Sequence, residues 1–441
     1  MFNISLRTGS FPTLWKSATI TPIPKVKVVS KLGELRPISL TPVLGKILEG
    51  LVADQLLADI RANLDPKQYG NLKGKSTTHY LVDLLDFVLK GLEEKNTMAL
   101  ILLVDFQKAF DYIDHTVAVT QLFHLGCRPS ILRFVGDFLS HRRHRVAYQD
   151  ALSEYDEITC GVPQGTRLGV LVFLAVVDML CRDDETRVKY VDDLAMAEII
   201  NIRNQILFAM QGKLNSLSRE CKHLNMITNP IKCEALYPCP TQLKRPITYP
   251  DLQLNNVPLP IAHEVKLLGV YIDNTISWQT HVNYILKRAN RMIFILYRAR
   301  QFGFAVSTML TLYQWYIRTG LEYAAPVWHP GLTVQQQTSL ERVQKRCYRI
   351  MLGDAYISYE NAIATLQTAS LYDRREALTL RFGKSLLRSP EFRRLLPPTG
   401  DAVHQHRTRH RHLLRPIRGS ARYKKTTIPY IVDLLNREQI S

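Results

Sequence analysis

Two adjacent aspartates, Asp192 and Asp193, lie between two short β-prone runs, RVKY and LAMAEII. Such runs on either side of a short polar break predict a strand, a tight turn and a second strand, with both carboxylates at the tip. Two carboxylates so close together repel each other and are normally stabilised by cations. A polar dipeptide in an ordinary loop is the alternative, but the flanking runs favour a cation-binding hairpin.

A third carboxylate ends a separate apolar run. The sequence ALILLVD is apolar up to its last residue, Asp105, and predicts a buried strand that terminates in an acid. Together with Asp192 and Asp193, it would complete a metal site. Two divalent ions held roughly 3.5–4 Å apart by shared carboxylates are the usual arrangement for in-line phosphoryl transfer. The spacing along the chain does not show by itself that the three side chains converge.

Length and charge are consistent with an enzyme that acts on a polyanion. The chain has 441 residues, which predicts two or three lobes, and its hydrophobic content of 46% is that of a folded protein. Lys and Arg (57) exceed Asp and Glu (39), so the formal net charge is +18. An excess of this size favours nucleic acid as the partner over an acidic membrane surface.

Several protein classes are disfavoured. The longest apolar run, residues 170–179, is far below the roughly 20 residues that span a bilayer, so no membrane partner is expected. The first residues, MFNISLRTGSFPTLWK, lack the apolar core of a signal peptide. The seven cysteines are scattered without CxxC spacing, which argues against a disulfide framework or zinc module. We therefore expect an intracellular protein of the nucleus and cytoplasm.

Hydrophobic periodicity and turn residues predict the first two thirds of the chain as a mixture of helices and strands. The expected elements are an extended segment at 14–25, a helix at 43–60, an amphipathic helix at 81–92, a helix buried on all sides at 168–180, a helix from 204 to about 224, a Pro-rich excursion at 238–260 and a strand-like run at 265–273.

From residue 278 onward the pattern becomes helical and basic. A first helix carries an apolar stripe on one side and Lys287, Arg291 and Arg298 on another, and a second begins at Thr333 with Gln336 completing a capping box. These basic faces suit either ordinary solvated surface or contacts with a nucleic-acid backbone. The stretch 401–425 holds eight Lys or Arg and four His, and predicts a phosphate-binding or tethering tail.

The motifs occur in an order that resembles one family. They are IPK (23–25), LRPISL (35–40), LVDFQKAFDYIDH (103–115), GVPQGTRLGVLVF (161–173) and KYVDD (189–193). This set resembles the reverse transcriptases of non-LTR (LINE-type) retrotransposons, and the resemblance extends from about Phe11 to the end of the chain. It implies an α+β, right-hand polymerase fold of fingers, palm and thumb, with an antiparallel palm sheet and a helical C-terminal region.

The resemblance also implies a division of the chain. The fingers and connecting helices would occupy residues 1–98, the palm with its catalytic motifs 99–275, the helical thumb and post-thumb region 276–395, and a basic tail 396–441.

By matching position, the resemblance assigns the acidic residues. Asp105 and Asp192 would be the principal ligands of two Mg²⁺ ions, with Asp193 completing the catalytic cluster and Mn²⁺ as a possible substitute. Asp111, Asp114 and His115 belong to the same motif, and we interpret them as structural because they lie past the strand end.

Nucleotide-pocket residues follow in the same way. Phe110 matches the bulky gate that excludes a ribose 2′-hydroxyl, and Gln164 with Gly165 matches the turn that lines the nucleotide pocket. Four further residues match family positions: Lys25 and Arg36 would face the incoming triphosphate, Lys232 would protonate the leaving pyrophosphate, and Gly269 would belong to the primer grip.

The function so implied is that of an RNA-directed DNA polymerase copying retrotransposon RNA into cDNA. Its expected partners are an RNA template, a DNA primer or target, and dNTPs. No endonuclease-like segment precedes the motifs, so a nuclease is expected from a larger precursor or a partner. The alternative from another class is a catalytically decayed RNA-binding protein derived from such a polymerase, and an intron maturase is a third hypothesis that the text after residue 278 disfavours.

Overall fold

The buried strand that ends before Asp105 is the centre of a five-stranded sheet in the computed structural model, which describes residues 1–202, 208–239, 251–399 and 413–440. The strands, in sheet order, are β12 (Ile261–Ala262), β9 (Glu234–Leu236), β3 (Thr97–Val104), β8 (Asp193–Asn201) and β7 (Val188–Tyr190). All neighbours are antiparallel except β12, which runs parallel to β9. The predicted antiparallel palm sheet is therefore confirmed, with one short parallel strand at its edge.

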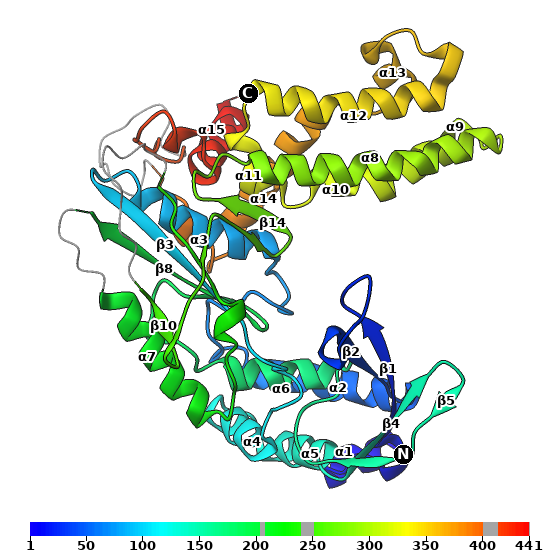
Figure 1. Ribbon diagram of the computed structural model, residues 1–441, viewed down its shortest axis with the longest axis vertical. Coiled ribbons are helices and arrows are strands. Elements are labelled where there is room, and N and C mark those ends of the chain that lie inside the picture. Colours follow the sequence, from blue (N-terminus) through cyan, green and yellow to red (C-terminus); the bar gives the residue numbers. More distant parts are fainter. Residues whose placement is uncertain (203–207, 240–250, 400–412, 441) are drawn as a thin grey trace.

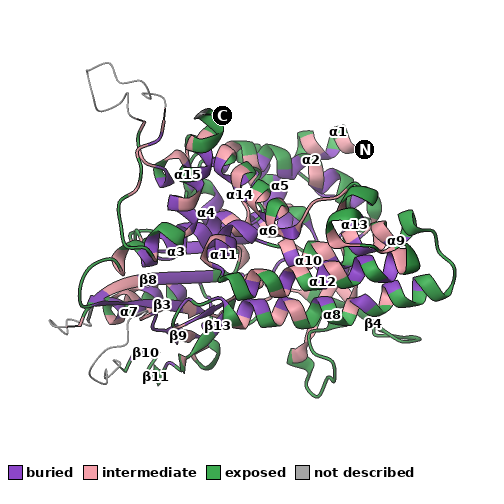
Figure 2. Ribbon diagram, turned by 90° about the horizontal axis from the view of Figure 1, so that it is seen from above, coloured by how far each residue is buried: buried purple, intermediate pink, exposed green. Residues whose placement is uncertain are grey.

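Strand β3 is buried on both faces, which explains its continuous apolar sequence. Ala99 and Ile101 pack into a core shared with α3 and the C-terminal helices. Leu100 and Leu102 point the other way, into a core shared with helices of the N-terminal half. The sheet thus separates two hydrophobic cores, and Figure 2 shows β3 and β8 coloured as buried along most of their length.

A second sheet lies at the opposite end of the molecule (Figure 1). Its strands are β1 (Ser17–Pro24), β2 (Leu35–Leu40), β4 (Arg142–Tyr148), β5 (Ala151–Leu152) and β6 (Asp156–Ile158). The expected extended segment is confirmed as β1, which pairs antiparallel with β2 and parallel with β4. This sheet therefore draws strands from both sides of the boundary expected at residue 98.

Helices of the N-terminal half pack between and behind these sheets. They are α1 (Phe2–Thr8), α2 (Val43–Ile60), α3 (Thr77–Gly91), α4 (His115–His124), α5 (Pro129–Leu139), α6 (Arg167–Val177) and α7 (Phe208–His223). Helix α2 has the predicted ends, and α6 is buried almost throughout, as expected. Part of the predicted helix 204–224 is confirmed as α7; residues 203–207 lie outside the described part of the chain.

Two expectations need correction. Helix α3 begins earlier than predicted, at Thr77, and its polar side is buried too: Asp83 and Asp86 are covered because α3 lies between the sheet and the C-terminal helices. The run 265–273 is not one strand but a hairpin of β13 (Glu264–Leu267) and β14 (Val270–Asp273), because Leu268 and Gly269 both adopt positive φ. A smaller hairpin, β10 (Gln253–Leu254) and β11 (Val257–Pro258), precedes it.

The C-terminal region is helical, as predicted. It comprises α8 (Gln279–Gln301), α9 (Val306–Leu312), a π-helical stretch (Tyr313–Arg318), α10 (Thr319–Glu322), α11 (Ala325–Trp328), α12 (Val334–Leu352), α13 (Tyr359–Thr365), α14 (Leu371–Arg388) and α15 (Thr427–Ile440). The capping box of Thr333 and Gln336 is confirmed at the start of α12. Helix α8 buries its apolar stripe and exposes Lys287, Arg291 and Arg298. No described helix has the length and apolarity needed to cross a membrane.

Short 3-10 helices complete the described chain. They are η1 (Thr13–Trp15), η2 (Leu32–Glu34), η3 (Pro230–Lys232), η5 (His329–Gly331), η6 (Gly353–Ala355), η7 (Arg393–Leu395) and η9 (Tyr423–Lys425).

The end of the chain is not a free tail. Helix α15 packs against α14 and α3, and Ile428, Ile431 and Leu435 are buried there. Gly383 of α14 allows this approach, since a Cβ at that position would lie 2.6 Å from the side chain of Ile431. The His-rich part of the predicted tail, residues 400–412, lies outside the described residues.

Replacing Ile431 by alanine tests this packing. The side chain is fully buried, so Ile431→Ala should lower the free energy of unfolding by about 2–5 kcal/mol, measured by chemical denaturation. Ile357→Ala is the matched control, because Ile357 is 79% exposed in the same helical region. Equal stabilities of the two variants would contradict the docking of α15.

Candidate polymerase active site

The register of the central sheet brings the predicted acidic residues to one place. Val104, the last residue of β3, pairs with Leu194 at the start of β8, so Asp105 follows directly beside the hairpin tip. Asp192 lies in the turn between β7 and β8, and Asp193 opens β8. The predicted strand–turn–strand is confirmed, and the convergence that spacing left open is present in the fold.

The turn has an unusual backbone. Val191 adopts a φ of 61°, a conformation that a β-branched residue rarely takes. Holding a residue in this region costs about 1–3 kcal/mol, so contacts from elsewhere must stabilise the turn.

The surroundings of Asp192 and Asp193 disfavour their charged forms. Part of the Asp193 side chain reaches solvent, but protein atoms surround most of it. This partial burial, together with the negative charges of Asp192 and Asp105, raises the pKa of Asp193 to about 6. The pKa of Asp192 is also raised, first by the surrounding protein and then by Asp105, although Arg36 opposes the shift. The cluster therefore holds uncompensated negative charge.

The donor chemistry of this cluster suits a hard divalent cation. Asp105 accepts a hydrogen bond from Asn229 Nδ2 at 3.1 Å, and no ion pair to Asp105, Asp192 or Asp193 occurs among the described residues. However, the part of the chain that the structure describes contains no group of three or more acidic, histidine or cysteine side chains gathered closely enough to hold a metal. The predicted triad is thus brought together without forming a complete, preassembled ligand set.

Asp105 and Asp192 open onto a cavity of about 1190 Å³. Its walls come from the β1–β2 hairpin on one side and from the loop after β3 on the other. The predicted residues that line it are Lys25, Arg36, Asp105, Phe110, Gln164, Asp192 and Lys232. Asp193, Gly165 and Gly269 are not part of the lining.

Phe110 is held rigidly at the cavity wall. Its ring stacks on Phe173 of the buried helix α6, with centroids 4.2 Å apart and planes at 12°. Its carbonyl oxygen accepts a hydrogen bond from Val162 N at 2.9 Å. A ring that stacks on a buried helix and extends from an anchored backbone can act as a steric wall.

Gln164 links three segments of the cavity. The backbone carbonyl oxygen of Gln164 accepts a hydrogen bond from Ser39 N of β2 at 2.9 Å, and its side-chain Nε2 donates to Asp111 Oδ1 at 2.9 Å. Gly165 follows with a φ of 99° and lies against Ser39. A Cβ there would lie at an ordinary 3.6 Å from the side chain of Ile38, so the positive φ rather than a lack of space favours glycine.

Asp111, interpreted as structural, accepts the hydrogen bond that holds the Gln164 amide, and it also lines the cavity, which the sequence did not indicate. Asp114 and His115 are structural, as expected. Asp114 caps α4 by accepting hydrogen bonds from Thr116 and Val117 amides, and His115 Nε2 contacts the Gly161 carbonyl at 2.8 Å.

Asn229 was missed by the sequence analysis. Besides its side-chain bond to Asp105, its backbone N–H donates to the Asp105 carbonyl at 2.8 Å, so it orients the strand end as well as the carboxylate. Only its position in NPIK, three residues before the predicted Lys232, was available as a signal.

The cationic wall faces the acidic cluster. Arg36 pairs with Ile23 in the β1–β2 ladder, and the Lys25 backbone N–H donates to Glu34 O at 2.8 Å. Lys25 and Arg36 are exposed in the cavity, and Lys232 ends the short helix η3 on the opposite side. The cavity thus carries positive and negative walls that suit a metal-bound triphosphate.

Gly269 lies apart from the cavity in the β13–β14 turn. A Cβ there would come 3.2 Å from the ring of Tyr323, whose hydroxyl donates to Leu268 O at 2.8 Å. The turn is therefore fastened to the helical region that follows.

Comparison with known proteins gives consistent results. Residues 23–272 match the family described as reverse transcriptase (RNA-dependent DNA polymerase). Two relatives from Drosophila melanogaster are each 29% identical to this chain: the probable RNA-directed DNA polymerase from transposon BS and the RNA-directed DNA polymerase from mobile element jockey. Each alignment covers 65% of this chain, and it covers 33% of the first relative and 32% of the second. A third, the probable RNA-directed DNA polymerase from transposon X-element, is 24% identical, with 85% of this chain and 42% of the relative covered.

The chain therefore spans about a third to two fifths of the length of these relatives. Among solved structures, apo telomerase from Candida tropicalis aligns with a TM-score of 0.46 and 11% identity over 85% of this chain and 66% of that one. That likeness is too distant to carry an argument.

Removing one carboxylate from the cluster tests its electrostatics. Asp193→Asn should raise the thermal unfolding midpoint of the metal-free protein at pH 8, because it relieves repulsion. The folded-state pKa of Asp193, about 6, exceeds its ordinary 3.8, so the folded state binds this proton more tightly. The ionised Asp193 destabilises the unaltered protein fully above about pH 6, and this destabilisation fades as the pH falls toward 3.8. The increase in unfolding midpoint caused by Asp193→Asn should therefore shrink over the same pH range.

Asp150→Asn, in the exposed β4–β5 turn, is the control and should change the midpoint little at either pH. An Asp193→Asn gain that does not depend on pH would contradict the cluster.

Proposed function

The chain belongs to the reverse transcriptase (RNA-dependent DNA polymerase) family, and we propose that it copies RNA into DNA by adding dNTPs to the 3′-hydroxyl of a primer. One observation carries the proposal: Asp105 and Asp192 line the same cavity as Phe110, Gln164 and the cations of the β1–β2 hairpin. Among the described residues, these carboxylates have no ion-pair partner, and they lie opposite a cationic wall. This arrangement suits a nucleotide that binds together with divalent metal ions.

Reverse transcriptases use divalent metal ions, and we propose two Mg²⁺, with Mn²⁺ as a substitute, held by Asp105 and Asp192 with Asp193 completing the negative field. Such ions, when bound, activate the attacking hydroxyl and neutralise the charge on the leaving pyrophosphate. Asn229 orients the Asp105 carboxylate by its hydrogen bond, which supports a defined geometry at one ligand.

The remaining roles concern the nucleotide. Lys25 and Arg36 would bind the triphosphate, and Lys232 would donate a proton to the pyrophosphate from the opposite wall. Gln164 is prevented from rotating by Asp111, so its amide would meet the sugar or base in one orientation. Phe110 would exclude the 2′-hydroxyl.

Template and location follow from the same resemblance. We propose retrotransposon RNA as template, a DNA primer or target strand, an endonuclease from a larger precursor or a partner, and residence in nucleus and cytoplasm. The net charge of +18 supports the nucleic-acid partners. The division into fingers, palm, thumb and tail stays a prediction, as does the primer-grip role of Gly269.

A primer-extension assay tests the activity. With Mg²⁺, oligo(dT)-primed poly(rA) and labelled dTTP, the unaltered protein should extend the primer, and Asp192→Asn should lower the rate by at least about 10³-fold, since losing a metal ligand removes several kcal/mol of charge stabilisation. Asp150→Asn should retain the rate. An unaltered protein that binds template-primer tightly in a salt-dependent manner, yet makes no product, would instead support the decayed RNA-binding alternative.

Sugar selection tests Phe110. Phe110→Ala should raise the efficiency of rUTP incorporation relative to dTTP by roughly 10–100-fold, because removing the ring leaves room for the 2′-oxygen. The measurement is the ratio of kcat/KM values for the two nucleotides. Phe123→Ala, at a 63% exposed position on α4, is the control. If both variants keep the original ratio, Phe110 is not the gate.

A further inference from the structure

The turn that carries Asp192 is held in a conformation that its own sequence disfavours. Val191 has a φ of 61°, and its branched side chain makes this region unfavourable. A strained residue persists only where its surroundings determine its conformation. The contacts of Val191 therefore identify what keeps Asp192 in place.

Those contacts come from Gln68. Its side chain is 1% exposed, and its Oε1 accepts hydrogen bonds from Val191 N at 3.0 Å and Gly70 N at 2.8 Å. Its buried Nε2 has no hydrogen-bond partner among the described residues. The side chain is thus used only as an acceptor, and one of its two bonds fixes the turn.

The backbone around Gln68 continues the sheet beyond its edge strand. Tyr69 N donates to Lys189 O at 2.8 Å, and Lys189 N donates to Lys67 O at 2.9 Å. Gly70 then passes so close that a Cβ would lie 2.7 Å from Val191 N. The segment 67–70 therefore acts as a splint along β7 and its turn.

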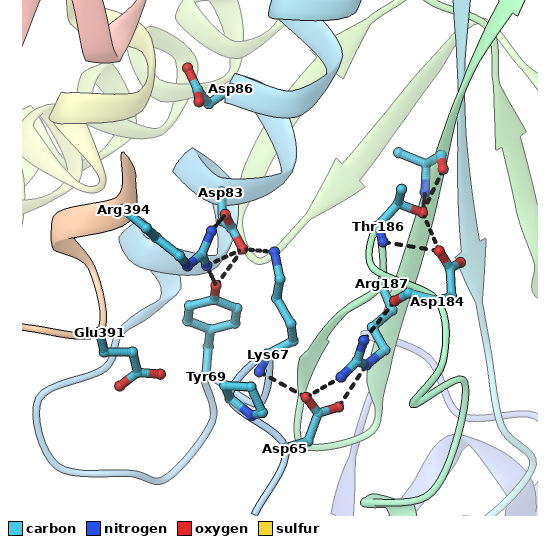
Figure 3. Close-up of polar contacts among 12 residues, drawn as sticks. Asp65, Lys67, Tyr69, Asp83, Asp86, Asp184, Thr186, Arg187, Glu391 and Arg394 are labelled. Carbon is cyan, nitrogen blue, oxygen red and sulfur yellow. Dashed lines mark hydrogen bonds and ion pairs between the residues drawn. The ribbon is translucent and has the colours of Figure 1, made fainter. Parts of the chain in front are cut away.

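Buried ion pairs hold this splint on one side (Figure 3). Asp65 is fully buried and pairs with Arg187 at 2.6 Å and with Lys189 at 2.7 Å, so it fastens the splint to the strand that precedes the turn. A buried charge with two partners resists displacement, because losing either one leaves charge uncompensated.

A second anchor reaches the C-terminal region. Asp83 of α3 pairs with Lys67 at 2.6 Å and with Arg394 at 2.8 Å, and it accepts a hydrogen bond from the Tyr69 hydroxyl at 2.5 Å (Figure 3). The splint is therefore bound on one side to the palm strand and on the other to α3 and the segment that follows α14.

We propose that Gln68 is a positioning residue of the polymerase site: by holding the Val191 amide, it fixes the Asp192 carboxylate relative to Asp105. The inference rests on the proposed function for its catalytic consequence and on the geometry of the turn for its structural part. Gln68 is not among the residues that line the cavity. It acts through the turn.

Steady-state kinetics separate positioning from folding. Gln68→Met keeps the length of the side chain and removes the acceptor, and it should lower kcat for primer extension by about 100-fold, the effect expected of roughly 1 Å of misplacement. The KM for dTTP and the affinity for template-primer should change less than about 3-fold, because both depend on groups that the substitution leaves in place.

Gln344→Met is the matched control. Gln344 is also fully buried, and its amide joins Tyr313, Tyr359 and the Ala369 carbonyl in the C-terminal region, far along the chain from the turn. This variant should lower the thermal unfolding midpoint and leave kcat of the folded protein within about 3-fold, since it loses hydrogen bonds but not the hold on Val191. A loss of kcat in both variants that merely follows their loss of stability would overturn the proposal.

A second substitution tests the strain directly. Glycine adopts positive φ freely, so in a Val191→Gly background Gln68→Met should cost less than about 10-fold in kcat. If Gln68→Met lowers kcat by the same factor with glycine at position 191 as with valine, the proposal is contradicted.

Amide hydrogen exchange decides the structural part without any activity. Gln68→Met should accelerate exchange of the Val191 amide by at least about 10-fold, because that N–H loses its acceptor, whereas Gln344→Met should not. Unchanged exchange at Val191 would overturn the proposal even if the polymerase is active. Accelerated exchange in a protein that extends no primer would support the hold on the turn and refute the proposed function instead.

Discussion

The antiparallel pairing of β3 with β8 is the constraint on which the active site depends. Both strands are buried on both faces, so a slip of one residue would exchange the residues that face the two cores. That cost fixes the register, and the register sets Asp105 beside the tip that carries Asp192. The position of the carboxylates is thus a consequence of core packing. The fixed register keeps them close together despite their mutual repulsion.

Charge is arranged in two layers behind and in front of that tip. In front, Asp105 and Asp192 face the cavity, and the surrounding protein, followed by neighbouring carboxylates, raises the pKa of both Asp192 and Asp193 at that tip. Behind it, acids and bases are paired: burial opposes the ionisation of Asp65, but Arg187 and Lys189 outweigh it and lower its pKa to about 2. The ion pairs of Asp65 hold the backbone behind the tip in place. Asp105 and Asp192, which have no ion pair among the described residues, can therefore remain available to a cation.

Local patterns predicted the elements with strong periodicity and the residues at their ends. Helix α2, the buried helix α6, the capping box at Thr333 and the aspartates of the hairpin were all readable, because each depends on neighbours in the sequence. The pairing of β1 with β4 and the docking of α15 were not, since they join segments far apart in the chain. Gln68 and Asn229 escaped notice for the same reason: a lone amide has no pattern, and its role appears only with its distant partner.

The support of the turn that carries Asp192 extends beyond the region that carries the sequence motifs. The family match ends at residue 272 and includes every proposed metal ligand, yet Asp83 beneath the splint is paired with Arg394, more than a hundred residues later. Without Arg394, the buried Asp83 carboxylate would lose one of its two ion-pair partners among the described residues and would keep Lys67 and the hydrogen bond from Tyr69. A polypeptide limited to the matched region would therefore contain the chemistry of the site while lacking one of the contacts that hold Tyr69 and Lys67 against the strand. The segment that follows α14 thus helps to support the turn that carries Asp192.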